Sequence, residues 1–149
     1  MAIRNIVQVG DETLRKRCFE VVNFDEKLHQ LLDDMKATMR LADGVGLAAP
    51  QVGVLRRVFV VEVDGAYYEC INPTIVKASG IQRGVEGCLS VKGKQGVVDR
   101  PMKVTVKAFN RHGKPFVVHA TGFLARAFCH EYDHLDGVLY IDKAISMEG

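Results

Sequence analysis

Hydrophobic residues between positions 23 and 43 recur with the spacing of an amphipathic helix, and the charged residues lie off their face. Asn23 stands where an N-cap residue belongs, with Glu26 three residues later, and Gly44 stands where a C-terminal glycine belongs. The pattern therefore predicts an N-terminal helix over 23–43. Its apolar face would consist of Leu28, Leu31, Leu32, Met35, Met39 and Ala42.

The middle of the chain has the alternation typical of strands. Stretches 57–63 and 66–71 flank Asp64-Gly65, a dipeptide that favours a two-residue hairpin turn. Residues 102–109 alternate between apolar and polar side chains, and a further short strand is expected after the turn that follows them.

A second helix is expected to begin at Thr121 as its N-cap and to end at Gly137. The order helix, strands, helix predicts an α+β fold, with mixed or antiparallel sheets around a central C-terminal helix. A chain of 149 residues is expected to form one domain, spanning 1–149.

Composition narrows the classes of function. The chain is 48% hydrophobic and 26% charged, and its net charge is +2 with no basic stripe, so we expect no direct nucleic-acid partner. The apolar runs are too short to cross a membrane, and the first residues lack the features of a signal peptide. Four scattered cysteines do not suggest a disulfide framework, and a cytoplasmic location is expected.

The segment 130–134 reads His-Glu-Tyr-Asp-His, a H-E-x-x-H pattern within the second predicted helix. Histidines at i and i+4 project from one helix face, about 40° apart, so His130 and His134 can reach one metal ion. Glu131 lies close enough to handle a proton from water at that metal. A polar stripe of structural histidines is the alternative interpretation.

The third metal ligand is expected upstream of this motif. A metallopeptidase would place a histidine at position 140, which is Tyr140, and the only glutamate downstream is Glu148 near the end. Cys88, in the segment 86–90, is the best upstream source, because a thiolate is a strong ligand. Cys129 points away from the shared metal on a helical wheel and is expected to be a packed cysteine.

Segment 44–51 is rich in small residues and ends in Gln51. It formally matches a dinucleotide-binding loop, but such a loop follows a strand and opens a helix, whereas this one follows a helix and contains Pro50. We expect its backbone to lie against an extended peptide, with Gln51 as an amide donor.

Segments 44–51, 86–90 and 130–134 together resemble, in order and spacing, the signature segments of peptide deformylases: G-x-G-x-A-A-x-Q, E-G-C-L-S and H-E-x-D-H. The resemblance extends over nearly the whole chain. It implies a hydrolase that removes the N-terminal formyl group from formyl-methionine of newly made polypeptides and releases formate. Its partners would be formyl-methionyl peptides, including nascent chains at the ribosome, and it would act as a monomer.

The resemblance also implies roles for single residues. Metal-bound hydroxide would attack the formyl carbon, with Glu131 as general base and then acid. The side-chain amide of Gln51 and the backbone N–H of Leu89 would stabilise the oxyanion. The ligand types alone indicate zinc, but the family implies Fe2+, for which Zn2+, Ni2+ or Co2+ can substitute. The ligands would be Cys88, His130 and His134.

A pocket for the methionine side chain is implied beside the metal. Phe123 and Ala127 share a helix face with both motif histidines, which supports such a pocket, and ordinary core packing is the alternative for Phe123. Gly46 would hydrogen-bond the substrate backbone. The pocket residues would be Val45, Leu89, Phe123 and Ala127.

The chain departs from the family pattern at Lys92, Gln95 and Asp99. Gln95 stands where the family carries an arginine near the substrate backbone. These departures leave open a non-catalytic metal-binding paralogue that binds formylated peptides, beside the less favoured metallopeptidase.

Overall fold

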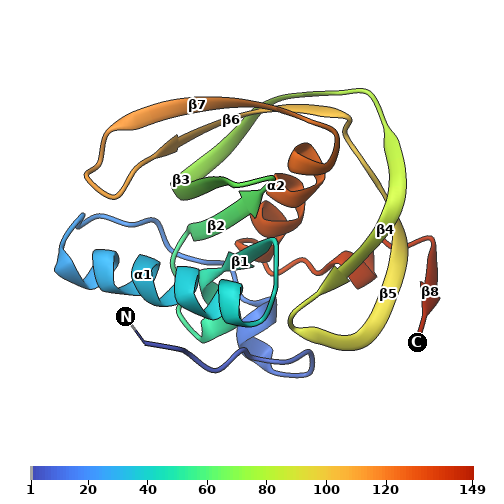
Figure 1. Cartoon of the computed structure of the whole chain (residues 1–149), viewed down its shortest axis with the longest axis horizontal. Helices are drawn as coiled ribbons and strands as arrows, with labels where there is room; N and C mark the ends of the chain where they lie inside the picture. The colour runs from blue at the N-terminus through green and yellow to red at the C-terminus, as the bar shows by residue number, and fades with distance from the viewer. Residues whose placement is uncertain (1) are drawn as a thin grey trace.

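The computed structural model describes residues 2–149 and confirms an α+β fold with antiparallel sheets and a C-terminal helix (Figure 1). Its two α-helices are α1 (Glu26–Leu41) and α2 (Gly122–His134), and three short 3-10 helices cover Glu12–Arg15, Ala49–Val52 and Tyr140–Asp142. The strands are β1 (Gly46–Ala48), β2 (Val58–Val63), β3 (Ala66–Ser79), β4 (Gln82–Cys88), β5 (Val91–Arg100), β6 (Lys103–Phe109), β7 (Pro115–Thr121) and β8 (Ser146–Glu148).

Two antiparallel sheets surround α2. One has the order β1-β2-β3-β6-β7, and the other has the order β4-β5-β8. The predicted hairpin joins β2 to β3, and the positive φ angles of Asp64 and Gly65 (+52° and +81°) match the turn that this dipeptide favours. The sequence pattern did not indicate β4 or β5, where glycines and charged residues interrupt the alternation, nor the three-residue strands β1 and β8.

The ends of α1 differ from the prediction. Asp25, not Asn23, is the N-cap, and its side chain accepts a hydrogen bond from Leu28 N at 3.1 Å. At the other end Asp43, not Gly44, adopts the left-handed conformation, with φ of +58°. An aspartate tolerates this region because its short polar side chain can bond locally, so the helix ends without a glycine there.

The second helix also differs in its bounds. Thr121 is its N-cap residue, as expected, but its side chain makes no capping hydrogen bond. The helix ends at His134, three residues before the expected Gly137, which has a positive φ of +75°. A Cβ at Gly137 would collide with the backbone of Arg15, so close packing also requires this glycine.

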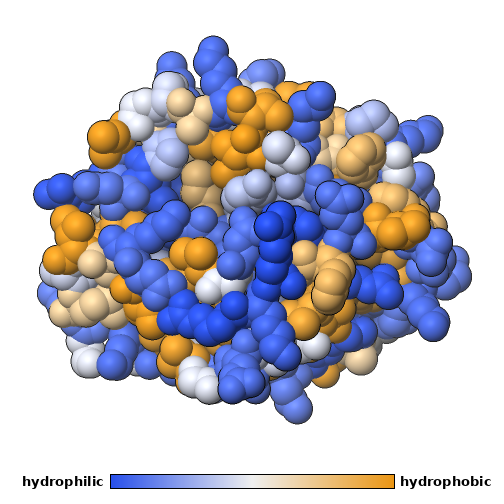
Figure 2. Space-filling view, turned by 180° about the vertical axis from the view of Figure 1, so that it is seen from behind, coloured by the Kyte–Doolittle hydropathy of each residue, from blue (hydrophilic) through white to orange (hydrophobic). Residues whose placement is uncertain are grey.

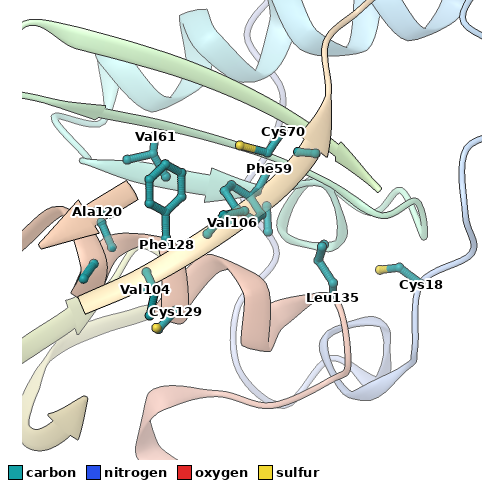
Figure 3. Packing of buried hydrophobic residues seen from close by; sticks show 14 residues of the cluster. Cys18, Phe59, Val61, Cys70, Val104, Val106, Ala120, Phe128, Cys129 and Leu135 are labelled. Carbon is teal, nitrogen blue, oxygen red and sulfur yellow. The ribbon is translucent and has the colours of Figure 1, made fainter. Parts of the chain in front are cut away.

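The main core lies between α2 and the five-stranded sheet. Phe128 of α2 packs against Phe59 of β2, with ring centroids 5.8 Å apart (Figure 3). It also packs against Tyr68 of β3, with ring centroids 5.3 Å apart. The opposite face of β2 carries Val58 and Val60, which pack under the apolar face of α1. The five-stranded sheet is thus covered by α1 on one side and by α2 on the other, and α2 lies between the two sheets.

Hydrophilic side chains separate the hydrophobic areas on the rear face of the molecule (Figure 2). No helix within residues 2–149 combines the length and the apolar character needed to cross a membrane.

Candidate active site

One face of α2 brings both motif histidines opposite the end of β4. Cys88 Sγ lies 3.4 Å from His134 Nε2, and one ligand atom from each of Cys88, His130 and His134 lies within 4.8 Å of the others. One thiolate and two imidazoles at this spacing fit a single divalent metal and leave a coordination position for water or substrate. The structure therefore brings together the three residues expected to be ligands.

His130 is oriented by a buried carboxylate that the sequence did not single out. Glu86 Oε1 lies 2.8 Å from His130 Nδ1, which leaves Nε2 of the ring for a metal. Arg100 donates two hydrogen bonds to Glu86, at 2.8 and 2.9 Å, and Arg126 donates one at 2.6 Å. Burial opposes ionisation of Glu86, but Arg100 and His130 hold its pKa well below the usual range.

The second histidine, His134, is almost completely buried. Burial and the neighbouring His130 lower the pKa of His134 well below its usual value, and neutral imidazole is the form that binds a metal. Tyr140 stacks on His130 with ring centroids 5.9 Å apart. Tyr140, the residue at the position of a metallopeptidase histidine, thus packs against one of the candidate metal ligands.

Glu131 is buried beside the cluster, and its Oε1 has no hydrogen-bond partner among residues 2–149. A Cβ added at Gly46 would lie only 2.8 Å from Glu131 Cδ, so a glycine is needed there to make room for the carboxylate. Burial raises the pKa of Glu131 to about 7. A carboxylate with such a pKa can both accept and return a proton near neutral pH.

The amide of Gln51 is fixed in one orientation. Its Oε1 accepts a hydrogen bond from Ala48 N at 2.9 Å, and its Nε2 donates to Ser90 Oγ at 3.0 Å and reaches Cys88 Sγ at 3.5 Å. The N–H side of this buried amide therefore faces the cluster. Leu89 follows Cys88, and its side chain packs so closely over Gly44 that a Cβ there would lie 2.7 Å from Leu89 Cδ1.

A cavity of about 350 Å³ opens in front of these residues. Phe123 is 52% exposed and Val45 is 43% exposed, so both lie at the rim, and the core-packing alternative for Phe123 does not hold. Ala127 is buried in the wall. His134 does not line the cavity and lies behind it. The lining includes the expected residues Val45, Gly46, Gln51, Cys88, Leu89, Phe123, Ala127, His130 and Glu131.

The three departures from the family pattern lie outside this cavity lining. Gln95 is on β5, where its side chain donates to Glu148 of β8 at 3.3 Å. Asp99 pairs with Arg83 on the neighbouring strand β4, at 2.8 Å. Lys92 is exposed on the same strand, β5.

Sequence reasoning missed Glu86, Arg100, Arg126 and Ser90 as parts of the site. Glu86 and Ser90 stand inside the E-G-C-L-S segment, so that segment was the available signal. Arg126 carried a weaker signal, because it is a charged residue within an apolar helical run.

The comparison with known proteins agrees with this geometry. A family model described as polypeptide deformylase matches residues 3–149. The chain belongs to the polypeptide deformylase family. Its principal activity is hydrolytic removal of the formyl group from the N-termini of nascent peptides, as the resemblance implied.

Relatives in this family are similar over most or nearly all of their length. The chain is 54% identical over 145 residues to a peptide deformylase of Caldicellulosiruptor bescii, covering 97% of this chain and 87% of that protein. It is 51% identical to peptide deformylase 1 of Clostridium acetobutylicum, over 100% of this chain and 99% of that protein.

Solved deformylase structures have the same fold. The enzyme from Thermotoga maritima superimposes with a TM-score of 0.95 at 40% identity, covering 97% of this chain and 99% of that one. The enzyme from Synechococcus elongatus, solved in complex with actinonin, has a TM-score of 0.92 at 39% identity, covering 95% and 78%.

Proposed function

We propose that deformylation takes place in the cavity beside Cys88, His130 and His134, which hold one divalent metal. The observation that carries this proposal is the convergence of a thiol and two imidazoles next to a buried carboxylate that lacks a partner among residues 2–149. When bound, the metal acidifies a water molecule and polarises the formyl oxygen. Fe2+ is the proposed ion, and Zn2+, Ni2+ or Co2+ can replace it.

Glu131 moves the proton in both halves of the reaction. As general base it takes a proton from the attacking water, while a C–O bond forms at the formyl carbon. As general acid it gives that proton to the amine nitrogen, while the C–N bond breaks and formate leaves. Its raised pKa of about 7 suits both transfers.

Two donors stabilise the negative charge that develops on the formyl oxygen. The side-chain amide of Gln51 is held toward the cluster. The backbone N–H of Leu89 belongs to the peptide unit that directly follows Cys88. Each such donor contributes about 3–4 kcal/mol in comparable sites.

The cavity rim would bind the peptide. Val45, Leu89, Phe123 and Ala127 would enclose the methionine side chain, and Gly46 would hydrogen-bond the substrate backbone. We further propose that the chain is a single-domain monomer that meets formyl-methionyl nascent chains in the cytoplasm, near the ribosome.

The decisive experiment measures formate release from a short formyl-methionyl peptide. Protein purified without oxygen and loaded with Fe2+ is compared with metal-free protein, the zinc form and the Glu131→Ala variant. We expect fast release with Fe2+ and a loss of about 100-fold or more in kcat for Glu131→Ala, because general acid–base catalysis contributes this much. Metal content serves as the control, since Glu131→Ala should still hold one equivalent.

A binding-only paralogue would give the opposite result. It would hold one metal and bind the peptide without releasing formate, and Glu131→Ala would leave its peptide affinity unchanged. That outcome would overturn the proposed mechanism.

A further inference from the structure

The extended N-terminal segment binds directly to both segments that carry the proposed oxyanion donors. Val7 N donates to the carbonyl oxygen of Gln51 at 2.7 Å. The next residue, Gln8, donates from its side-chain Nε2 to the carbonyl oxygen of Leu89 at 3.0 Å. Adjacent residues of one segment therefore join two parts of the site that lie far apart in the sequence.

A further pair of contacts closes this connection. Val9 N donates to the carbonyl oxygen of Ser90 at 2.8 Å, and the hydroxyl of Ser90 accepts from Gln51 Nε2 at 3.0 Å. Ser90 and Gln51 are both buried, so the two segments are tied to each other and to the N-terminal segment. Each bond orients a peptide unit or an amide that adjoins a proposed donor.

The N-terminal segment is itself anchored on α1, below which it runs in Figure 1. Ala2 N and Arg4 Nε donate to the carboxylate of Asp34 at 2.7 and 2.9 Å, and Arg4 N donates to Thr38 Oγ1 at 2.9 Å. The Gln8 side chain is also held locally, because its Nε2 lies 3.3 Å from the carbonyl oxygen of Ile6. The side-chain amide of Gln8 is therefore held by its own segment as well as by its hydrogen bond to Leu89.

We propose that Gln8 is a positioning residue for deformylation, which fixes the Leu89 segment relative to Gln51. The inference rests on the proposed roles of Gln51 and Leu89 as oxyanion donors. Within residues 2–149, Gln8 is not part of the cavity lining and hydrogen-bonds to none of the three proposed metal ligands, so it would act through the Leu89 carbonyl. Because transition-state stabilisation depends on donor placement to a fraction of an ångström, a loosened segment should slow the chemical step more than it weakens substrate binding.

The test compares Gln8→Ala, Gln51→Ala, the combined variant and Asn5→Ala. Asn5 is an exposed amide on the same segment, with no side-chain hydrogen bond in the described part of the chain, so Asn5→Ala is the matched control. We expect Gln8→Ala to lower kcat about 10-fold with KM nearly unchanged. Metal content and melting temperature should match those of Asn5→Ala. In the combined variant the loss in kcat should be smaller than the product of the two single losses, because both residues act on one oxyanion site.

Three results with the Gln8 variants would overturn the inference. The first is a kcat of Gln8→Ala equal to that of the control. The second is a loss accompanied by lower metal content or melting temperature, which would indicate a structural role. The third is a combined loss equal to the product of the single losses. If Gln51→Ala itself keeps the wild-type kcat, the oxyanion assignment fails and this inference fails with it.

Discussion

The four cysteines differ in their surroundings, although each is a single thiol in the sequence. Burial raises the pKa of Cys18 and Cys129 to about 11, and it raises that of Cys70 further. Cys129 packs in the core, as expected. Cys88 is only partly buried and belongs to the candidate metal site with His130 and His134. Reactivity and metal binding should therefore be confined to one of the four.

We predict that brief alkylation of metal-free native protein near pH 8 modifies Cys88 alone, since thiols with a pKa of about 11 stay protonated there. One equivalent of Zn2+ or Co2+ should protect Cys88 from the reagent. Mass spectrometry of the digested protein measures both effects, and unfolded protein, in which every cysteine should react, is the control. Equal labelling of Cys18 in the native state would contradict this prediction.

At the scale of single elements, the start of α1 shows how the folded chain selects one of two neighbouring candidate N-cap residues. Asn23 and Asp25 are both good N-cap residues by type, and Asn23 has a glutamate at the favourable distance. In the folded chain the Asp25 side chain accepts from Leu28 N, while Asn23 precedes the helix and is exposed. Asp25 is the cap because α1 begins at Glu26, so Asp25 directly precedes the first turn and Asn23 lies two residues further upstream.

Asp25→Ala is expected to destabilise the protein by about 1 kcal/mol, because an N-cap hydrogen bond is lost. For a chain of this length, the melting temperature should fall by about 2–4 °C. Thermal unfolding followed by circular dichroism measures the change, and Asn23→Ala serves as the matched control with no expected effect. A larger effect of Asn23→Ala would show that Asn23 is the cap, as its sequence context suggests.

At the scale of the whole molecule, Asp34 connects the N-terminal segment to α1. Burial opposes ionisation of this carboxylate, but hydrogen bonds from Ala2, Arg4 and Gln30 together lower its pKa from the ordinary value of 3.8. A carboxylate whose pKa is lower in the folded than in the unfolded state stabilises the folded state fully at pH values above its unfolded-state pKa. That stabilisation is lost as the pH falls through the folded value.

Asp34→Asn should therefore lower the free energy of unfolding at pH 7, by about 1–3 kcal/mol, since bonds to a charged acceptor are lost. The difference from wild type should shrink as the pH is lowered through the folded-state pKa of Asp34, which lies below its ordinary value of 3.8, because the carboxylate becomes protonated there. Urea unfolding of both proteins across this range measures the effect. A difference that stays constant with pH would exclude the carboxylate charge as its origin.

Local periodicity determines much of the fold. Three features could be predicted because they depend on residues only a few positions apart, whose types show the pattern in the sequence. They are the apolar face of α1, the hairpin at Asp64-Gly65 and the alternation of β6. The strands β4 and β5 could not be predicted in this way, because their glycines weaken the local strand pattern. Their pairing with each other in the folded chain compensates for these glycines.

The sequence by itself also determined the chemistry of the site, since three short motifs supplied the thiol, the imidazoles, the carboxylate and the amide. Only the tertiary structure decided what orients them. Glu86 meets His130 across 44 residues, Ser90 meets Gln51 across 39, and Gln8 meets Leu89 across 81. No local period encodes such pairs, because they form only when the N-terminal segment, β4 and α2 pack together.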